Sequence, residues 1–387
     1  MGIRALPEEE ERMTKRWRRR IGLLLIAFVA VLVSGCYDRL DLEEASSPFL
    51  VGYDLDANND MIVYVTNPVF SEHVGKKTHD IRVKADTSRE AREKEDIRSA
   101  GTFHGRKIQV VVIGKRFMQH PDWFRILDVY FRDSRNSLTP RVVAFNGPLS
   151  EIIDLHQKNQ PMLPILLRDM IDTKSARSES VDTTLQELHR QVYEKGMTPY
   201  ISEVDVVNNE VVLQGTTLLD HSGKFATNLN TEESILLRVL QNSVKKTVSL
   251  TIPIPGVPKQ GPFETDRLSF STEQVKTIID TAFDKDRFRF DIRVRMRVAL
   301  TERLFTYAKG EEERLERLIT EQVQQKMDDL VLKLKRNRVD PIGLGLYARA
   351  HEYNRYKTVE EQWGETVSES DIRTSVMVEL GSTGPVK

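Results

Sequence analysis

The clearest hydrophobic pattern in the chain is a strict alternation close to its C-terminal end. Apolar residues occupy every second position from Phe288 to Val298. The positions between them hold Arg289, Asp291, Arg293, Arg295 and Arg297. A period of two predicts a strand with one buried face and one wet face. The wet face is a candidate surface for an anionic partner or lipid headgroups, but charged strand faces also serve to keep a sheet soluble.

Other segments predict strands and helices in alternation. The run of β-branched residues from Ile108 to Gly114 is typical of a strand buried on both faces. Further strands are predicted at residues 49–54, 61–66, 141–145, 204–206, 211–219 and 372–380, the first two as a hairpin. Helical spacing predicts helices at residues 87–99, 121–131, 149–156, 181–194, 231–240 and 311–334. We interpret the first helix, in which Arg and Glu alternate, as solvated, and residues 271–286 also favour a helix over a strand.

Two breaks divide these elements. Residues 196–199 combine Gly with Pro, and residues 252–262 hold four prolines and two glycines. At roughly 100–200 residues per domain, a chain of 387 residues has room for two or three domains. We therefore expect an α+β protein of three mixed α/β domains with central sheets flanked by helices. The expected ranges are a leader at 1–35, an N-terminal domain at 36–198, a small middle domain at 199–261, and a C-terminal domain at 262–387, whose largely antiparallel sheet packs on long helices.

The first 35 residues have the order of a secretory leader. The basic run Lys15–Arg20 precedes Ile21–Val33, thirteen residues without a charge. Because a membrane-spanning helix needs about 20 apolar residues, this segment is short for an uncleaved anchor, which is the alternative. A start at Met13 would leave a conventional leader from Met13 to Gly35.

The end of this leader predicts a lipid anchor. Val33-Ser34-Gly35-Cys36 has the aliphatic, small, small, Cys pattern of a bacterial lipobox. Cys36 is the only cysteine, so it has no partner for an intramolecular disulfide. From this motif we expect Cys36 to become an S-diacylglyceryl cysteine at the N-terminus of the mature chain. Its two acyl chains would anchor the protein stably, whereas a single chain binds a membrane only marginally. Residues 36–387 would then form a body tethered to the outer face of a membrane.

Charge and motifs exclude several functions. Lys and Arg total 57 against 58 for Asp and Glu, and the leader holds a net excess of cations, so the mature chain has no basic field to gather nucleic acid. The eight histidines lack ligand spacing, and no P-loop or nucleophile elbow occurs. Residues 54–60 lack the Gly of a calcium loop, and G-L-G-L-Y-A at 343–348 follows a helix rather than a strand. We interpret both segments as turns and expect no metal, no cofactor and no enzymatic activity.

Several segments together resemble the Ger(x)C spore germination lipoproteins, the C subunits of nutrient germinant receptors. The resemblance covers essentially the whole mature chain in order and spacing. The matching residues are Gly35–Arg39, Asp41–Glu44, Val51–Asp54, Val112–Lys115, Phe131–Asp133, Glu302, Asp340, Gly343–Gly345, Trp363 and Glu379–Gly381. Residues 271–286 depart from the family, since they look more helical than expected.

The resemblance implies a place and a role for the protein. It implies three mixed α/β domains, attachment to the outer face of the spore inner membrane, and partnership with membrane-spanning A and transporter-like B subunits. It also implies a role in germination as a scaffold or coupling subunit without turnover, and it carries over Cys36 as the only functional residue. The alternatives are a lipid-anchored solute-binding protein of a transporter, which needs two similar parallel-sheet lobes, and a lipid-anchored envelope hydrolase, which needs a nucleophile.

Overall fold

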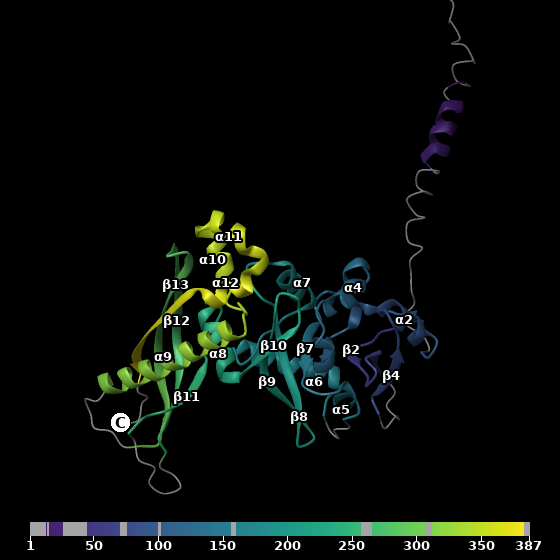
Figure 1. Ribbon diagram of the computed structural model, residues 1–387. Helices are drawn as coiled ribbons and strands as arrows, with labels where there is room; N and C mark the ends of the chain where they lie inside the picture. The colour runs from purple at the N-terminus through teal and green to yellow at the C-terminus, as the bar shows by residue number, and fades with distance from the viewer. Residues whose placement is uncertain are drawn as a thin grey trace, which may run out of the picture. The chain divides into compact units, whose positions relative to one another are not determined.

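The computed structural model describes residues 13, 15–25, 45–69, 76–99, 102–155, 160–256, 265–305 and 312–382. The chain divides into two compact units, Met1–Ala45 and Ser46–Lys387. In the first unit, residues 15–25 are helical. The second unit holds two larger sheets with their helices (Figure 1).

The first of these sheets has eight strands in the order β10-β9-β8-β7-β6-β2-β3-β4. Its central strands β2, β6, β7 and β8 are parallel, and antiparallel partners extend the sheet at both ends. The strands are β2 (Leu50–Leu55), β3 (Met61–Pro68), β4 (Thr78–Lys84), β6 (Val110–Gly114), β7 (Arg141–Phe145), β8 (Tyr200–Val207), β9 (Glu210–Leu219) and β10 (Phe225–Asn230). A separate short ladder joins β1 (Ala45–Ser46) to β5 (Thr102–Phe103).

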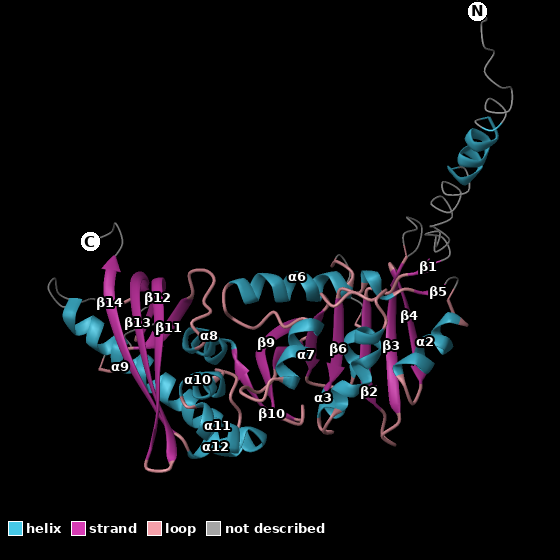
Figure 2. Ribbon diagram, turned by 90° about the horizontal axis from the view of Figure 1, so that it is seen from above, coloured by secondary structure: helices cyan, strands magenta, loops and turns pink. Residues whose placement is uncertain are grey.

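Helices cover both faces of the eight-stranded sheet. Figure 2 shows α6 on one side of the strands and α3 and α7 on the other. The helices are α2 (Ser88–Asp96), η2 (Gly105–Lys107), α3 (Lys115–Met118), η3 (Trp123–Leu127), α4 (Asp128–Arg132), α5 (Leu149–Ile153), α6 (Leu163–Ala176) and α7 (Leu185–Tyr193). Val110 and Val112 of β6 lie in one core, while Val111 and Ile113 lie in another. A strand between two cores is apolar at every position, and this explains the continuous β-branched run.

The second sheet has four strands in the order β11-β12-β13-β14. The strands β11 (Ser249–Pro253), β12 (Arg267–Asp284) and β13 (Arg287–Arg303) are antiparallel, whereas β14 (Asp371–Ser382) runs parallel to β13. The alternate apolar residues of β13 share one core with α9 (Glu312–Arg336). The other helices of this part are α8 (Thr231–Leu240), α10 (Leu344–His351), α11 (Tyr353–Val359), η4 (Glu360–Gln362) and α12 (Trp363–Glu369).

The structure confirms the α+β class and most of the predicted elements. The alternating segment forms β13, the β-branched run contains β6, and residues 312–336 form α9. The prediction that residues 271–286 favour a helix is wrong, because most of them lie in β12 and pair with β13 in register up to Asp284. Strand pairing and burial of alternate side chains outweigh local propensity in this segment.

Neighbouring predicted domain ranges share a sheet or a hydrophobic core. The strands on the two sides of residue 198 belong to one sheet, since β8 pairs with β7. Leu218 and Leu236, from the predicted middle domain, lie in the same core as Phe290 from the predicted C-terminal domain. Residues 257–264, around the second boundary, lie outside the described residues. The boundaries at 198 and 261 stay predictions.

Candidate functional site

The predicted lipidation site, Cys36, lies outside the described residues, as does most of the apolar leader segment. Within the part of the chain that the structure describes, no helix has the length and apolarity to cross a membrane. Ala45 and Ser46 are the first described residues after Cys36. The contacts of Ser46 are therefore the described contacts that lie nearest in sequence to the predicted anchor.

Ser46 is held by partners from three parts of the body. Its carbonyl accepts a hydrogen bond from His104 N at 2.8 Å. Its hydroxyl lies 3.1 Å from Glu95 Oε1 and 3.2 Å from Asn67 Oδ1. These partners belong to α2, to β3 and to the segment after β5. The position at which the N-terminal segment enters the body is therefore fixed by hydrogen bonds.

Glu95 is fully buried beneath Ser46, and the expectation of a solvated helix was wrong at this position. Ala91 and Glu95 are four residues apart, so they share one face of α2, and that face packs on the sheet. Burial raises the pKa of Glu95, and hydrogen bonds from Asn67 Nδ2 (3.1 Å) and Ser46 oppose the rise. Alternation of Arg and Glu along a helix does not reveal which turn meets a core.

Asp340 is a second buried carboxylate, located in the turn between α9 and α10. Its side chain accepts hydrogen bonds from Gly343 N (2.8 Å), Gly345 N (2.9 Å) and Trp363 Nε1 (2.8 Å). Its backbone carbonyl accepts from Thr198 N, and its backbone N donates to Thr198 Oγ1, each at 2.9 Å. Burial raises the pKa of Asp340, while the N–H donors lower it. Asp340 therefore connects Thr198, two residues before β8, to the C-terminal helices.

Glycines permit this close contact. A Cβ on Gly345 would lie 2.6 Å from Gly196 O and 2.7 Å from Trp363 Cε2. Gly343, the residue before α10, has φ 86°, which lies in the left-handed region that favours glycine. The interpretation of residues 343–348 as a turn is wrong for most of the segment: Gly343 precedes α10, and residues 344–348 form the first part of that helix.

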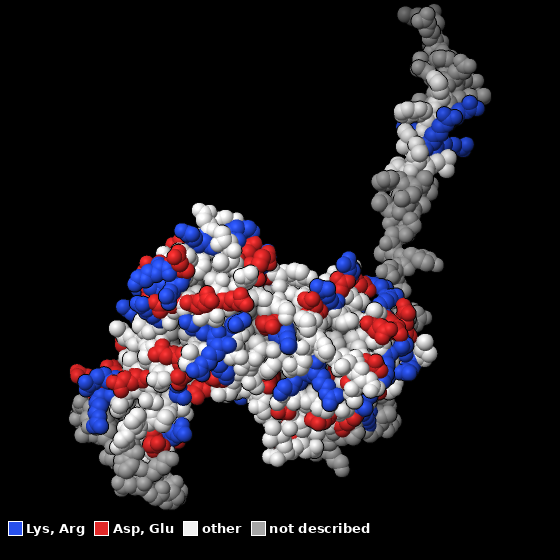
Figure 3. Space-filling model, viewed as in Figure 1, with Lys and Arg blue, Asp and Glu red and all other residues white. Residues whose placement is uncertain are grey.

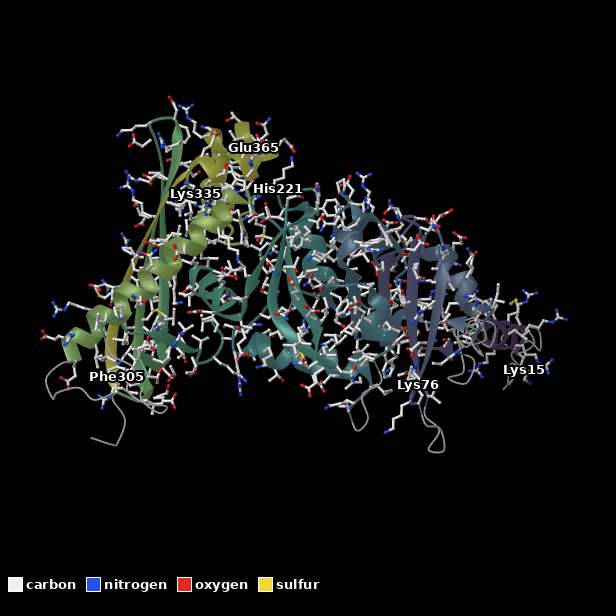
Figure 4. All side chains as sticks on the ribbon, turned by 60° about the horizontal axis from the view of Figure 1, so that its bottom comes forward. Lys15, Lys76, His221, Phe305, Lys335 and Glu365 are labelled. Atoms are coloured by element: carbon white, nitrogen blue, oxygen red, sulfur yellow. The ribbon has the colours of Figure 1, made fainter. Side chains whose placement is uncertain are left out.

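Two further contacts support the same junction. A Cβ on Gly364 of α12 would lie 3.4 Å from His221 Cδ2, and Figure 4 shows His221 near this helix. Burial lowers the pKa of His221. Arg349 of α10 forms a bidentate ion pair with Glu194, with N···O distances of 2.8 and 3.1 Å. Packing and charge therefore join the β8–β10 end of the first sheet to the helices of the second.

The carboxyl ends of the parallel strands, where open α/β sheets commonly bind ligands, hold the protein's own groups. Asp54 at the end of β2 accepts a hydrogen bond from Leu149 N at 2.8 Å, and a Cβ on Gly114 would lie 2.5 Å from Asp54 Oδ1. Lys115 Nζ donates to Asn146 Oδ1 at 2.6 Å. Burial raises the pKa of Asp54. These contacts position the start of α5 and fill the edge beside β2.

The acidic segment 54–60 ends β2 and forms the turn into β3, as we interpreted it. Asp56 accepts hydrogen bonds from Asn58 N (2.8 Å) and Asp60 N (3.0 Å). Lys84 pairs with both Asp56 and Asp60 and lowers the pKa of Asp56. Among the residues that the structure describes, no group of three or more His, Cys, Asp or Glu side chains is placed to hold a metal ion.

The exposed arginines of β13 are mostly paired. The ion pairs are Arg289–Asp291 (3.1 Å), Arg293–Asp280 (2.6 Å) and Arg297–Glu273 (3.1 Å). Arg295 instead lies directly opposite another cation, Lys276 of β12. Cations and anions are also interspersed over the face of the molecule that Figure 3 shows. This arrangement favours a solvated sheet face over a broad anion-binding surface.

Two of the hollows on the described part of the body combine size with polar or aromatic side chains. One, of about 530 Å³, is lined by polar residues that include Arg177, Glu179 and Glu232. The other, of about 320 Å³, lies between η3, α4 and α7, where the His189 ring contacts the tilted rings of Phe131 and Tyr193 at centroid distances of 4.3 and 4.7 Å. Neither lining combines a nucleophile with a base and an orienting group, the arrangement that covalent catalysis uses.

Comparisons with known proteins identify the family. Residues 38–206 match the family model described as "Spore germination protein N-terminal domain", and residues 214–384 match "Spore germination B3/ GerAC like, C-terminal". A solved structure described as "Crystal Structure of the GerBC protein" is similar in fold, with a TM-score of 0.58 and 16% identity over 86% of this chain and 96% of that chain. The comparison with curated proteins finds no match. The chain therefore belongs to the GerAC-like spore germination protein family.

Proposed function

We propose that this protein is the lipid-anchored C subunit of a spore nutrient germinant receptor, with a scaffolding or coupling role and no catalytic turnover. One observation carries the proposal: the family match begins at Asp38, two residues after the lipobox cysteine, Cys36. A lipoprotein leader is removed immediately before its cysteine, so the mature chain would begin where the family begins. The proposed location is the outer face of the spore inner membrane.

A lipid anchor would support a coupling role by raising the effective concentration of the protein near its membrane partners. A tether confines the body to a thin layer beside the membrane, where a second binding event becomes intramolecular and modest interfaces are enough. Membership of the GerAC-like family supports A-type and B-type membrane subunits as the partners in that layer. The junction at Asp340 would keep the two sheets together while they contact different partners.

The alternative function, a lipid-anchored solute-binding protein of a transporter, fits the fold less well. Such a protein needs two similar parallel-sheet lobes around a cleft. In this chain one sheet has eight strands and the other has four, of which β11, β12 and β13 are antiparallel. The two sheets are therefore not repeats of one lobe.

Purification from spore membranes tests the proposal. The tagged chain would be isolated in detergent, its partners identified by mass spectrometry, and the mass of its N-terminal peptide measured. We expect A-like and B-like membrane subunits to co-purify, and a peptide that begins at a diacylglyceryl Cys36. A Cys36→Ala variant is the matched control and should lose the modification and the membrane retention. Co-purification of transporter ATPase components, or an unmodified Cys36 behind an intact leader, would contradict the proposal.

A further inference from the structure

The length of the tether limits which part of the body can meet the membrane. Nine residues, 37–45, lie between Cys36 and Ser46, so ten residue steps separate the two. An extended chain spans at most about 3.3–3.6 Å per residue, so a lipid on Cys36 keeps Ser46 within roughly 35 Å of the bilayer surface. Side chains that surround Ser46 are therefore the part of the body most often close to headgroups.

The chain segment around Ser46 is basic in an otherwise acidic mature protein. Residues 76–107, which include β4, α2, β5 and η2, hold ten Lys and Arg against six Asp and Glu. Several of these carboxylates are engaged locally: Glu90 pairs with Lys94 (2.6 Å), Glu93 pairs with Arg89 (3.5 Å), and Asp96 accepts a hydrogen bond from Phe103 N (2.6 Å). Carboxylates outside the segment neutralise three of its cations, since Arg82 pairs with Asp154, Lys84 with Asp56 and Asp60, and Arg92 with Asp133. Among the described residues, the cations of this segment without a carboxylate partner are Lys77, Arg98, Arg106 and Lys107.

Three of these cations are close in sequence to residues that form hydrogen bonds with Ser46. Arg106 and Lys107 of η2 follow His104, whose backbone N donates to Ser46 O. Arg98 follows Glu95, which binds the Ser46 hydroxyl, and its guanidinium donates to the carbonyl of Arg82 at 2.8 Å rather than to a carboxylate. All three side chains are exposed, and none forms an ion pair with a carboxylate in the described part of the chain.

An exposed aliphatic residue accompanies these cations. Ile97, between Asp96 and Arg98 at the end of α2, is 86% exposed. An isolated exposed isoleucine needs no explanation on its own. Beside unpaired cations and a lipid tether, however, it matches the combination that binds membrane surfaces, in which apolar groups enter the headgroup layer and cations meet lipid phosphates.

We infer that Ile97, Arg98, Arg106 and Lys107, here called the anchor-side face, dock on the anionic phospholipid headgroups of the membrane that holds the anchor. The inference rests on the proposed lipidation of Cys36 for its orientation. The face supplies a second, electrostatic contact beside the lipid and so restricts how the body is presented to its partners. One lipid signal combined with a basic surface is a general arrangement for stable membrane attachment.

The tether itself offers a rival occupant for this face. Asp41, Glu43 and Glu44 lie between Cys36 and Ser46 and carry the opposite charge. The same segment also holds Leu40 and Leu42, so the experiment below includes variants that separate the tether from the bilayer. Carboxylates next to an anchor are also repelled by anionic headgroups, and cations on the adjoining body offset this repulsion. The bilayer fits both the charge and the apolar group of this face, and the short tether keeps the face within its reach.

Vesicle flotation of the unlipidated mature chain tests the inference. Residues 36–387 with Cys36→Ser would be mixed with vesicles of phosphatidylcholine alone or with 30% phosphatidylglycerol. We expect binding to the anionic vesicles that weakens with added salt. Because one cation near an anionic membrane contributes about fivefold in partitioning, Arg98→Gln with Arg106→Gln and Lys107→Gln should lower it about a hundredfold. Ile97→Ser should lower it further at any salt concentration.

Matched variants keep the outcome clear. Arg106→Gln with Lys107→Gln leaves the Arg98 hydrogen bond intact and should still lower partitioning about 25-fold, with an unchanged thermal melt as the check on folding. Lys276→Gln with Arg295→Gln removes two cations from the sheet face instead and should leave binding unchanged. An equal loss in both double variants would overturn the inference. So would binding without preference for phosphatidylglycerol, or binding that appears only after Asp41→Asn, Glu43→Gln and Glu44→Gln, which would assign the face to the tether.

This experiment separates the inference from the proposed function. The vesicles test the anchor-side face without any lipid on the protein, whereas the mass of the Cys36 peptide tests lipidation. An unmodified Cys36 together with selective vesicle binding would contradict the anchor alone. A diacylglyceryl Cys36 together with no vesicle binding would contradict the docking face alone.

Discussion

The two sheets of the body differ in what covers their faces. The eight-stranded sheet has a core on each side, so all five residues of β6 are buried. Among the described residues, the four-stranded sheet has a core on one side only. β13 therefore alternates between buried apolar residues and exposed or half-exposed charged ones. We therefore expect β6 to tolerate side-chain substitution at few positions and β13 to tolerate it at every second position.

The junction between these regions belongs to neither pattern. Asp340 binds three N–H donors within the C-terminal part and exchanges two hydrogen bonds with Thr198 beside the first sheet. A change at this residue therefore affects both regions together, whereas a change in β6 or β13 acts first within its own sheet.

The largest expected effect follows from removing that junction. Asp340→Ala would leave the N–H groups of Gly343, Gly345 and Trp363 buried without an acceptor, and we expect a loss of about 3–5 kcal/mol in the free energy of unfolding. Urea denaturation followed by tryptophan fluorescence measures it. The matched control is Asp329→Ala on the exposed side of α9, for which we expect a change within about 0.5 kcal/mol. A loss below about 1 kcal/mol at Asp340 would mean that the junction does not join the two regions.

The next prediction tests the comparison of the two strands directly. Ile113→Ala in β6 and Ile292→Ala in β13 should each cost about 2–5 kcal/mol, because both side chains are buried. Their chain neighbours should differ: Val112→Ala removes two buried methyl groups and should cost about 2 kcal/mol. Arg293→Ala loses only an exposed pair with Asp280 and should cost at most about 1 kcal/mol. Similar losses at Val112 and Arg293 would show that the second face of β13 is covered.

The same difference explains which elements could be predicted from the sequence. The period-two pattern of β13 and the continuous run of β6 each reflect what lies on the two faces of the strand, so both were recognisable. β12 was not, because much of its length lies on a partly exposed hairpin where Lys276, Asp280 and Asp284 are four residues apart, a spacing that also fits a helix. Its strand conformation depends on pairing with β13, which is a long-range contact that local patterns do not contain.

The candidate site divides in the same way. Cys36 could be proposed as a lipidation site from the sequence, because a lipobox is a short linear motif. Asp340, Gly343, Gly345 and Trp363 appear in the sequence only as part of a family resemblance, since their shared hydrogen bonds arise from the fold. Glu95 carries no local signal at all, because its burial depends on which turn of α2 meets β3 and Ser46. Predicting such a residue requires the packing of α2 and not its composition.

The pH dependence of stability tests the burial of Glu95. Burial raises its pKa above the value of about 4.5 for the unfolded chain, so the folded protein retains a proton that the unfolded chain loses. The stabilising contribution is full below that value and is lost as the pH rises through the folded pKa. Glu95→Gln lacks this titration, so the stability of the wild type relative to this variant should fall between pH 4 and pH 7, by about 1.4 kcal/mol per unit of pKa shift.

Urea unfolding at pH 4, 5.5 and 7 measures this difference. The control is Glu93→Gln on the same helix, since Glu93 is exposed and pairs with Arg89. We expect no comparable fall for the Glu93 variant between pH 5.5 and pH 7. A difference between wild type and Glu95→Gln that stays constant with pH would show that Glu95 is solvated, as the sequence pattern suggested.

The smallest expected effect concerns the exposed face of β13. Arg295 and Lys276 are direct cross-strand neighbours, and like charges in this position are destabilising. Arg295→Thr removes the repulsion and introduces a β-branched residue that suits a strand, so we expect stability to be unchanged or to rise by about 0.5 kcal/mol. Arg297→Thr is the matched control on the same face, and it should lose a few tenths of a kcal/mol because Arg297 pairs with Glu273. Thermal melts of the two variants side by side show whether each substitution raises or lowers stability.

A loss of more than about 1 kcal/mol for Arg295→Thr would mean that this cation has a partner on the sheet face. The contrast between one covered face and one solvated face would then no longer describe the four-stranded sheet.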